Sequence, residues 1–327
     1  MAASAPPLSH YEFSEPHMGT TFTIVLYAAD RTQAAHASRA AFARVAELDA
    51  RLTDYRDDSE AMRVSREAVG RAIPVSNDLF RVLSMAQALS ARTGGAFDVT
   101  IGPLSHVWRR ARRQSELPAE AEVQAARKAS GYRLVRLDPS ARAVRLATPG
   151  MRLDFGGIAK GYAADRGLEA MRAEGVSRAL LVAGGDVAVG DPPPGERGWR
   201  VAIAPYDNRT AAPVTSIVLA NAGVSTSGDA EQWVEIGGIR YSHIFDPRTG
   251  RPLTGQRQAT VVARDATTSD MLATTMCVLG PRAGLRLAND TPGVAAIVGV
   301  RSAGLRVQWA ASRRWAMYGV SDLPVPR

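Results

Sequence analysis

Short β-rich runs separated by glycine, proline and aspartate turns dominate the chain from residue 132 to the C-terminus. Turns this short join antiparallel neighbours, because a parallel pair needs a crossover of about a dozen residues or more. The pattern predicts an α+β fold with mixed, largely antiparallel sheets and helices packed on their faces. The runs are YRLVRLD, AVRLAT, MRLD, ALLVAGGDVAVG, WRVAIA, SIVLANAGV, WVEIG, IRYSHIF, ATVVARD, VAAIVGV, LRVQWAA and RRWAMY, with TFTIVLYA near the N-terminus.

Apolar residues at helical spacing predict five helices between these runs. Ser76 is a suitable N-cap for the second helix, and Ser269 for the last, which would place Asp270 in a near-surface first turn. Gly94-Gly95 and Gly280-Pro281 would end these two helices. The five are expected over residues 32–55, from Ser76 to the first glycine pair, after Pro118, through Met171, and from Ser269 to Gly280.

The composition favours one domain with a large core, because 46% of the 327 residues are hydrophobic and no Gly/Ser-rich linker divides them. We expect two lobes. The longest nearly apolar run, residues 179–189, contains Asp186 and is shorter than the roughly 20 residues of a membrane-spanning helix, which excludes an integral membrane protein. The first twenty residues have neither a basic start nor an apolar stretch, so no export signal is visible.

The net charge of +8, from 40 Lys and Arg against 32 Asp and Glu, favours anionic partners. The densest basic cluster, VWRRARRQ at residues 107–114, lies beside one tryptophan and lacks the interleaved aromatic residues of a single-strand binding platform. We interpret it as a solvated basic face and expect no nucleic-acid partner. The only cysteine, Cys277, lies in the apolar stretch MCVLG and is expected to be a buried structural thiol.

The segment DFGGIAKG, residues 154–161, is the most informative one for chemistry. A strand ends in Asp154, two glycines allow a tight turn, and Lys160 enters the next helix. Unpaired backbone N–H groups and a lysine at a helix start favour a phosphate group, although such a turn is also a common connector. The spacing matches neither GxxxxGK[ST] nor GxGxxG, which excludes P-loop and Rossmann sites.

Two further segments carry candidate polar groups. Asp270 and Thr274 are four residues apart, so they share a helical face, and one carboxylate with one hydroxyl suits Mg²⁺ better than zinc. A capped helix alone would also explain Asp270. His243, in the strand before the turn DPRTG, is either a general base at a sheet edge or a packed strand residue. The hydroxyl-rich GVSTSG, residues 223–228, suits phosphate or ribose.

Together and in this order, these segments resemble the ApbE family of FAD:protein FMN transferases, also called flavin transferases. The resemblance implies residues 1–16 as an N-terminal extension and residues 17–327 as one two-lobed family domain. One departure is Val99, where many members have proline. The matching segments are HMGTTFTI, AFDVTIGPL, DFGGIAKGYAAD, LLVAGGDVAVG, VSTSGD, YSHIFDPRTGRPL and the acid-threonine helix, which cover most of the chain.

The resemblance also implies that FAD lies in a cleft between the lobes, with Mg²⁺ on its diphosphate. His243 matches the family histidine that activates the acceptor hydroxyl, and Lys160 and Asp270 complete the implied catalytic set. The metal ligands would be the Gly157 carbonyl, Asp270 and Thr274, together with the backbone of Thr267. The implied FAD contacts are Met18, Tyr55, Ala96, Phe97, Asp98, Asp154, Lys160, Ser227 and Ile244.

The implied reaction is Mg²⁺-dependent transfer of FMN from FAD to a threonine or serine hydroxyl of an acceptor protein, with release of AMP. Hydrolysis of FAD to FMN and AMP by the same site, and FAD binding without turnover, are the alternatives. The implied acceptors are flavoprotein subunits of membrane electron-transfer complexes. Because family members commonly act outside the cytoplasm, we expect a periplasmic protein whose leader is missing from this sequence, with a cytoplasmic location as the alternative.

Overall fold

The computed structural model describes residues 7–203, 206, 215–230, 232–301 and 307–318. Its central element is an eight-stranded sheet with the strand order β1-β2-β6-β7-β10-β14-β15-β16, in which every neighbouring pair is antiparallel. The strands are β1 (Ser9–His17), β2 (Thr20–Ala28), β6 (Ala179–Ala183), β7 (Asp186–Val189), β10 (Ala222–Gly228), β14 (Gln256–Ala263), β15 (Ala295–Arg301) and β16 (Gln308–Ala311).

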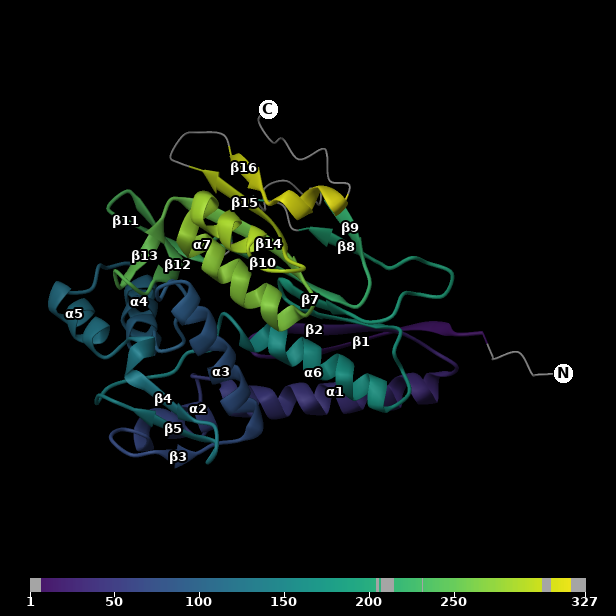
Figure 1. The fold of residues 1–327 in the computed structure, drawn as a ribbon, viewed down its shortest axis with the longest axis horizontal. Helices are drawn as coiled ribbons and strands as arrows, with labels where there is room; N and C mark the ends of the chain where they lie inside the picture. The colour runs from purple at the N-terminus through teal and green to yellow at the C-terminus, as the bar shows by residue number, and fades with distance from the viewer. Residues whose placement is uncertain (1–6, 204–205, 207–214, 231, 302–306, 319–327) are drawn as a thin grey trace.

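Each face of this sheet is covered by different elements. Helices α1 (Arg31–Leu52), α6 (Ala159–Ala173) and α7 (Ala266–Asn289) pack on one face, where Phe22, Ile24 and Leu26 of β2 are fully buried (Figure 1). The other face packs on the ribbon formed by β8 (Trp199–Ile203) and β9 (Thr215–Leu219). Because successive side chains of a strand point to opposite faces, this one sheet contributes to two hydrophobic cores, one on each face.

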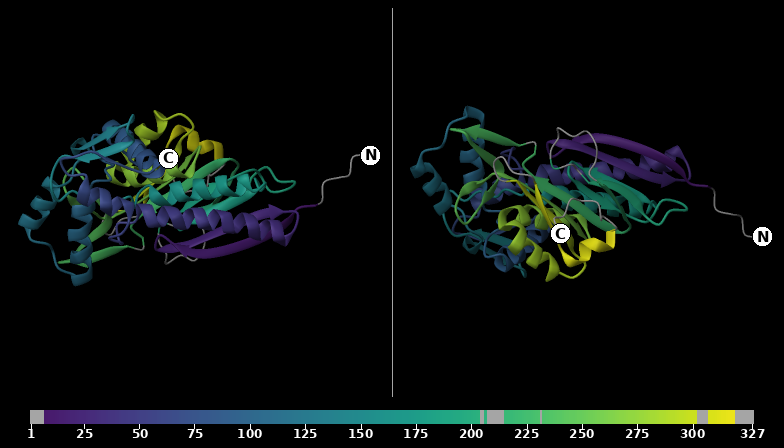
Figure 2. Two further views of the ribbon diagram at one scale, coloured as in Figure 1. Left: turned by 90° about the horizontal axis from the view of Figure 1, so that it is seen from below. Right: turned by 90° about the horizontal axis from the view of Figure 1, so that it is seen from above.

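A smaller helical lobe lies at one end of the molecule, opposite the β1–β2 hairpin (Figures 1 and 2). A three-stranded sheet of order β3-β5-β4 completes this lobe. The elements are α2 (Glu60–Glu67), α3 (Asn77–Arg92), α4 (Gly102–Gln114), α5 (Glu120–Lys128), the 3-10 helix η1 (Tyr132–Leu134), β3 (Ile73–Pro74), β4 (Val135–Asp138) and β5 (Ala143–Leu146).

A second small sheet, of order β11-β12-β13, joins the lobes. It consists of β11 (Trp233–Ile236), β12 (Ile239–Asp246) and β13 (Arg251–Thr254). The Trp108 ring of α4 stacks on Tyr241 of β12 at 5.9 Å, and its Nε1 donates to the Gly250 carbonyl at 3.0 Å. This sheet therefore fixes the turn after β12 against the helical lobe.

The predicted fold class is confirmed, and so are several details. Ser76 caps α3 by accepting from the Leu79 N–H at 3.2 Å, and Cys277 is fully buried. Burial raises the pKa of the Cys277 thiol to about 12, which makes it inert as a nucleophile. Within the expected N-terminal extension, residues 9–16 form an edge strand of the main sheet, because β1 pairs with β2 along its whole length.

The prediction for the last long helix is wrong at its start, while the predicted stop at Gly280-Pro281 coincides with a break in the helix. Asp265, not Ser269, caps α7, because its Oδ1 accepts from the Thr268 N–H at 2.7 Å. Ser269 lies inside the helix and its hydroxyl donates to the Ala266 carbonyl. The helical backbone is interrupted at Gly280, which has φ 73°, and a second helical segment then runs to Asn289, since proline is well tolerated in the first turn of this new segment.

Two predicted strands are also wrong. MRLD, residues 151–154, forms one isolated bridge between Arg152 and Ile101. RRWAMY is the 3-10 helix η2 (Arg313–Tyr318), which buries Trp315 against the main sheet and leaves Arg313 at the surface. No helix in the described ranges is long and apolar enough to cross a membrane.

Candidate active site

The Gly156-Gly157 turn, which leads into α6, has the geometry that the sequence predicts for a phosphate contact. Asp154 fixes the turn, because its Oδ1 accepts from the Gly156 N–H at 2.9 Å. Two N–H groups in the first turn of α6 already have partners, because the Ala159 N–H donates to the Phe155 carbonyl and the Gly161 N–H donates to Asp270 of α7. The start of α6 therefore offers a ligand mainly the positive end of the helix dipole and the Lys160 ammonium group.

Lys160 is held between buried acids. Its Nζ lies 3.0 Å from Oδ2 of Asp186, the first residue of β7, and 3.5 Å from the Gly156 carbonyl. Burial lowers the pKa of Lys160, but the carboxylates of Asp186 and Asp270 outweigh this effect and raise it. The lysine is thus a permanent cation beside the turn.

Asp270 is buried, with 1% of its surface exposed, so the expectation of a near-surface residue is wrong. It lies more than one turn into α7 and faces α6, where its Oδ2 accepts from the Gly161 N–H at 3.1 Å. Gly161 permits this close approach, since an added Cβ would lie 2.3 Å from the Ala266 carbonyl oxygen. Burial, then the charge of Asp186, raises the pKa of Asp270 to about 7.

Thr274 lies one turn beyond Asp270 in α7 and is the last member of the cluster around the Gly156-Gly157 turn. Its Oγ1 is 3.1 Å from Oγ of Ser227 on β10. A Cβ added at Gly157 would lie 3.2 Å from Thr274 and 3.3 Å from the Phe97 ring, so α7, the turn and the loop before α4 meet here. The structure therefore brings together five predicted site residues, Gly157, Lys160, Ser227, Asp270 and Thr274.

This arrangement fits a hard cation. Two buried carboxylates, Asp186 and Asp270, face one lysine, which leaves an excess negative charge that a cation would balance. No group of three His, Cys, Asp or Glu side chains in the described residues could hold a metal by itself. One carboxylate with a hydroxyl and a carbonyl instead suits Mg²⁺, which keeps water or phosphate oxygens as its other ligands.

Thr267 lies before Asp270 in α7, and its backbone N–H and hydroxyl both bond to another residue of the protein. Its backbone N–H donates to Oδ2 of Asp165 on α6 at 2.8 Å, and its hydroxyl donates to the same atom. Asp165 also accepts from the Ala266 N–H, so it caps α7 from the neighbouring helix. The backbone of Thr267 stays a predicted metal contact.

His243 lies on β12 with a defined tautomer. Its Nδ1 is 3.1 Å from the Gln232 carbonyl, which can only accept, so Nδ1 carries the proton and Nε2 is free to act as a base. Burial, with the charges of Arg112 and Lys160, lowers the pKa of His243. The ring is therefore neutral at pH 7, as a general base must be. Ile244, the next residue, is buried.

The loop before α4 is rigid and mostly buried. Asp98 uses both carboxylate oxygens internally, accepting from the Thr100 N–H at 2.8 Å and from the Tyr132 N–H at 2.7 Å. Ala96 and Phe97 are also buried. This segment can therefore offer a ligand its backbone, but not the Asp98 side chain.

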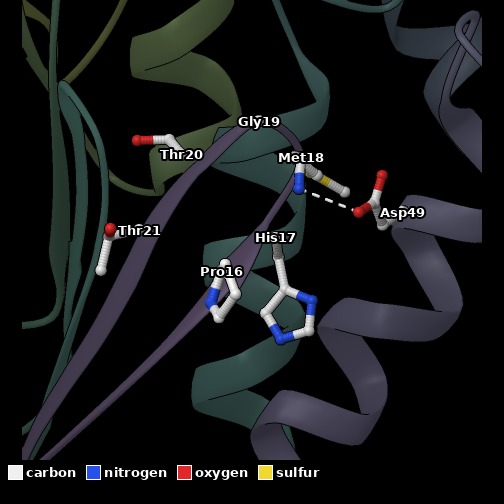
Figure 3. Close-up of a pocket in the computed structure, with 7 residues that line it drawn as sticks. All are labelled: Pro16, His17, Met18, Gly19, Thr20, Thr21 and Asp49. Carbon is white, nitrogen blue, oxygen red and sulfur yellow. Dashed lines mark hydrogen bonds between the residues drawn. The ribbon is translucent and has the colours of Figure 1, made fainter.

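Met18 lies in the β1–β2 turn. Its N–H donates to Oδ2 of Asp49 at 2.9 Å, and it has a positive φ of 49° (Figure 3). A cavity of about 540 Å³ opens at this turn. The turn adjoins the β6–β7 turn that precedes Asp186, because a Cβ added at Gly184 would lie 3.2 Å from Thr20.

Comparison with known proteins decides the family. The sequence model of the ApbE family matches residues 18–298. A Klebsiella pneumoniae protein named FAD:protein FMN transferase is 32% identical over 276 residues, which cover 84% of each chain. The chain belongs to the ApbE family.

Solved ApbE structures agree with this assignment. The flavin transferase ApbE from Vibrio cholerae superposes with a TM-score of 0.83 at 27% identity, covering 95% of this chain and all of that one. The ApbE protein from Thermotoga maritima gives the same TM-score at 28% identity, with coverages of 95% and 99%. The family resemblance and the α+β fold are therefore confirmed.

The basic cluster on α4 is the main feature that sequence reasoning missed in this ApbE chain. Arg109 is not solvated as predicted: it pairs with the buried Asp54 and, at 3.0 Å, with Oδ2 of Asp154. Its guanidinium also covers the Tyr55 ring, 4.5 Å from the ring centre. Arg109 thereby joins two predicted FAD contacts that lie 99 residues apart in sequence, and only the structure reveals this link.

Proposed function

We propose that this chain catalyses Mg²⁺-dependent transfer of FMN from FAD to a threonine or serine hydroxyl of an acceptor protein, with release of AMP. The observation that carries the proposal is the meeting of Lys160, Asp270 and Thr274 at the start of α6, in a chain of the ApbE family. Its curated relatives bear the name of this reaction.

The reaction forms one bond and breaks one. The acceptor oxygen attacks the phosphorus on the FMN side of the FAD diphosphate, and the bond from that phosphorus to the oxygen bridging to AMP breaks. The acceptor proton passes to Nε2 of His243, which is unprotonated because Nδ1 donates to the Gln232 carbonyl. The acceptor keeps FMN as a phosphoester, and AMP leaves with the bridging oxygen.

Several groups of the chain bind the diphosphate and oppose its charge. Lys160 supplies a fixed cation, and the positive end of the α6 dipole lies at the same turn. Asp270, Thr274 and the carbonyl of Gly157 would hold Mg²⁺, with the backbone of Thr267 as a further contact. When bound, Mg²⁺ neutralises diphosphate charge and stabilises the departing AMP.

The acceptor and the location belong to the same proposal. The family resemblance supports a flavoprotein subunit of a membrane electron-transfer complex as acceptor, and a periplasmic site of action. Fractionation of cells that express the complete gene tests the location: recovery only with cytoplasmic proteins would contradict it.

Incubation with FAD, Mg²⁺ and a candidate acceptor domain, followed by intact mass measurement of the acceptor, tests the reaction. We expect the acceptor to gain one FMN phosphoester, and a variant lacking the target hydroxyl to gain none. AMP and FMN released at the same rate without acceptor would instead identify an FAD diphosphatase. FAD binding with no AMP release under either condition would identify a binding protein.

A further inference from the structure

Arg112, in the last turn of α4, is a half-buried cation without a hydrogen-bond or ion-pair partner among the residues that the structure describes. Its neighbours in the basic cluster are satisfied. Arg109 pairs with two buried acids, Arg110 donates to Glu122 at 2.6 Å, and Arg113 is exposed to solvent. A guanidinium that loses part of its hydration without gaining a partner is unfavourable, so an anionic ligand would stabilise Arg112.

Arg112 lies beside His243, the proposed general base. Helix α4 packs against β12 (Figure 1), and the Trp108 ring stacks on the Tyr241 ring with 5.9 Å between the ring centres. Arg112 follows Trp108 by four residues and therefore shares its face of α4. His243 follows Tyr241 by two residues and shares its face of β12. The charge of Arg112 accordingly acts on His243 and lowers its pKa.

The helix alone does not account for this cation. A positive charge in the last turn of α4 interacts favourably with the negative end of the helix dipole. Arg113, in the same turn, already supplies that charge from an exposed position where it keeps its hydration. The half-buried position of Arg112, next to the proposed base, therefore suits ligand binding better than helix stability.

An unpaired cation beside His243 also opposes the proposed reaction. When His243 takes up the acceptor proton, it becomes an imidazolium that Arg112 and Lys160 repel and that Asp229, directly after β10, attracts. The charge of Lys160 is balanced by the buried Asp186, 3.0 Å from its Nζ, whereas no acid of the described residues pairs with Arg112. An anion bound to Arg112 would therefore favour the proton transfer.

The chemistry of the site favours the acceptor protein over FAD as the source of this anion. The FAD diphosphate has its own cations on the sheet side, Lys160 and the proposed Mg²⁺, whereas Arg112 belongs to the helical lobe. Nδ1 of His243 is bonded to the Gln232 carbonyl at 3.1 Å, so the acceptor hydroxyl has to approach Nε2. A carboxylate close to that hydroxyl in the acceptor chain would then reach Arg112.

The face of β12 that carries His243 also suits a polypeptide. Ile239 and Tyr241 lie on this face, and 48% of Ile239 is exposed. The pairing with β11 sets Val234 opposite Tyr241 and Ile236 opposite Ile239, so apolar side chains continue along this face to the hairpin tip. A peptide segment would cover these side chains, whereas a small anion would leave them open.

We propose that Arg112 binds a carboxylate of the acceptor protein and thereby places the acceptor hydroxyl at His243. The proposal rests on the proposed function for the acceptor and for the role of His243, and it adds the chemical class of residue that an acceptor carries. The ligand is an aspartate or glutamate near the target threonine or serine, held by charge-assisted hydrogen bonds from the guanidinium.

Binding of the acceptor to Arg112→Gln tests the proposal. The probe is the candidate acceptor domain of the transfer assay with its target residue changed to alanine, so that calorimetry measures binding without reaction. We expect the dissociation constant of this domain to rise by about five- to thirtyfold, and that of FAD to stay within about twofold. In transfer to the unaltered domain, the KM for the acceptor should rise by a similar factor.

Amide variants of the acceptor identify the carboxylate. Each aspartate or glutamate near the target hydroxyl is changed in turn to asparagine or glutamine. The change at the acid that Arg112 binds should weaken binding to the parent protein as Arg112→Gln does, and the two changes together should add less than about twofold to either one. If the effects were additive for every acid, no acceptor carboxylate would bind Arg112, and the proposal would be overturned.

Two control variants separate recognition from a general effect of charge. Arg113→Gln removes the same charge from an exposed position in the same turn and should leave acceptor binding unchanged. Arg112→Lys keeps the charge without the planar group, and it should bind the acceptor with an affinity between those of the parent and Arg112→Gln. Equal losses in Arg113→Gln and Arg112→Gln would show a diffuse attraction of the whole cluster, which would overturn the proposal.

The pH profile provides a readout that a damaged fold would not change in this direction. Arg112→Gln removes a charge that lowers the pKa of His243, while Lys160 and Asp229 continue to act on the ring. The decline of kcat/KM on the acid side should therefore begin at a higher pH in Arg112→Gln than in the parent protein. An unshifted decline would show that Arg112 does not face His243.

The outcome is distinguishable from that of the transfer reaction. Transfer by the parent protein, with unaltered acceptor binding by Arg112→Gln, would refute recognition by Arg112 and leave the function intact. Binding of the domain without transfer by the parent, with the expected loss in Arg112→Gln, would refute the function and leave the recognition intact. Weaker binding of FAD and AMP to Arg112→Gln, with acceptor binding unchanged, would make Arg112 a phosphate contact and overturn the proposal.

Discussion

The two sides of the Gly156-Gly157 turn carry charged clusters of different kinds. On the sheet side, Asp186 and Asp270 share one lysine, Lys160, and all three groups lie against α6 or in it. On the side of the helical lobe, Asp54 and Asp154 are matched by two arginines. The first cluster has an excess negative charge, while the second is neutral and ends in an aromatic ring.

This difference separates two tasks that one ligand requires. A cluster with excess negative charge depends on a bound cation, so changes in it should alter turnover and metal dependence. The cluster of the helical lobe is neutral without a bound ion and lies beside the Tyr55 ring. Changes in this cluster should therefore alter the affinity for FAD. The predictions below test whether the two sides divide the work in this way.

The largest effect is expected at His243. Charges from both sides act on this residue, because Lys160 and Arg112 of α4 each lower its pKa. The His243→Asn variant should transfer FMN about 10²- to 10⁴-fold more slowly than the parent while binding FAD normally. Single-turnover kinetics with a saturating acceptor measures this. The exposed His106 on α4 provides the control, and His106→Asn should react at the parental rate.

The pH profile sharpens that prediction. Because burial lowers the pKa of His243 below the usual 6.5, the base stays neutral near pH 6.5 and is protonated only at lower pH. The parental rate should therefore hold as pH falls to about 6.5 and then decline. At Mg²⁺ concentrations that saturate the site throughout, the variant should lack this decline and gain rate as pH rises. A parental profile in the variant would show that His243 is only packed in its strand.

The next effect in size concerns the metal side. Asp270→Asn keeps an acceptor for the Gly161 N–H but removes the charge, so the fold should survive while turnover falls by a factor on the order of a hundred or more. Titration of Mg²⁺ into EDTA-treated protein checks this. Asp290→Asn, at the exposed end of the same helix, should behave like the parent. Undiminished turnover in EDTA would show that the reaction requires no metal at Asp270.

Sequence predicted the sheet side far better than the helical side, for a physical reason. Asp270 and Thr274 share a helical face, and Lys160 follows a glycine turn, so short-range spacing identifies them. The partners of Arg109 lie 55 and 45 residues away, and no local pattern encodes such contacts. The same limit hides Asp186, whose role becomes visible only when β7 brings it to Lys160.

Local patterns also failed where two signals compete. Helix α4 begins with Gly102-Pro103, a pair typical of turns, and its arginines suggest a solvated surface. Proline is nevertheless favoured in a first helical turn, and Leu104 and Trp108 bury one face. In α7, both Asp265 and Ser269 are good caps, and only the hydrogen bond from the Thr268 N–H to Asp265 decides between them.

A smaller effect distinguishes the ligands. We expect FAD to bind at least about tenfold more tightly than riboflavin, because only FAD offers a diphosphate to Lys160 and to the start of α6. Calorimetric titration of FAD, FMN and riboflavin measures this order. Lys160→Gln should weaken FAD and leave riboflavin unchanged. If the parent protein bound FAD and riboflavin with equal affinity, the diphosphate would make no contribution to binding at this site.

The smallest effect is a shift in thermal stability on the sheet side, which Mg²⁺ should reverse. Folding raises the pKa of Asp270 from 3.8 to about 7, so the folded protein binds this proton more tightly than the unfolded chain. The resulting stability is present below about pH 4 and is lost as pH rises through about 7. In EDTA, the melting temperature should therefore fall by a few degrees between about pH 5 and pH 8.

Mg²⁺ should reverse this loss, because a cation bound to Asp270 replaces the proton as the neutralising charge. The stabilisation by Mg²⁺ should accordingly be small at about pH 5, where the proton competes, and largest at about pH 8. Differential scanning fluorimetry in Mg²⁺ and in EDTA measures both curves. Asp270→Asn should reduce the pH dependence in EDTA and abolish the Mg²⁺ response, whereas Arg109→Gln should retain the Mg²⁺ response. If the stabilisation by Mg²⁺ were equal at both pH values, or if it survived in Asp270→Asn, the cation would bind away from Asp270. The two clusters would then not differ in their need for a cation.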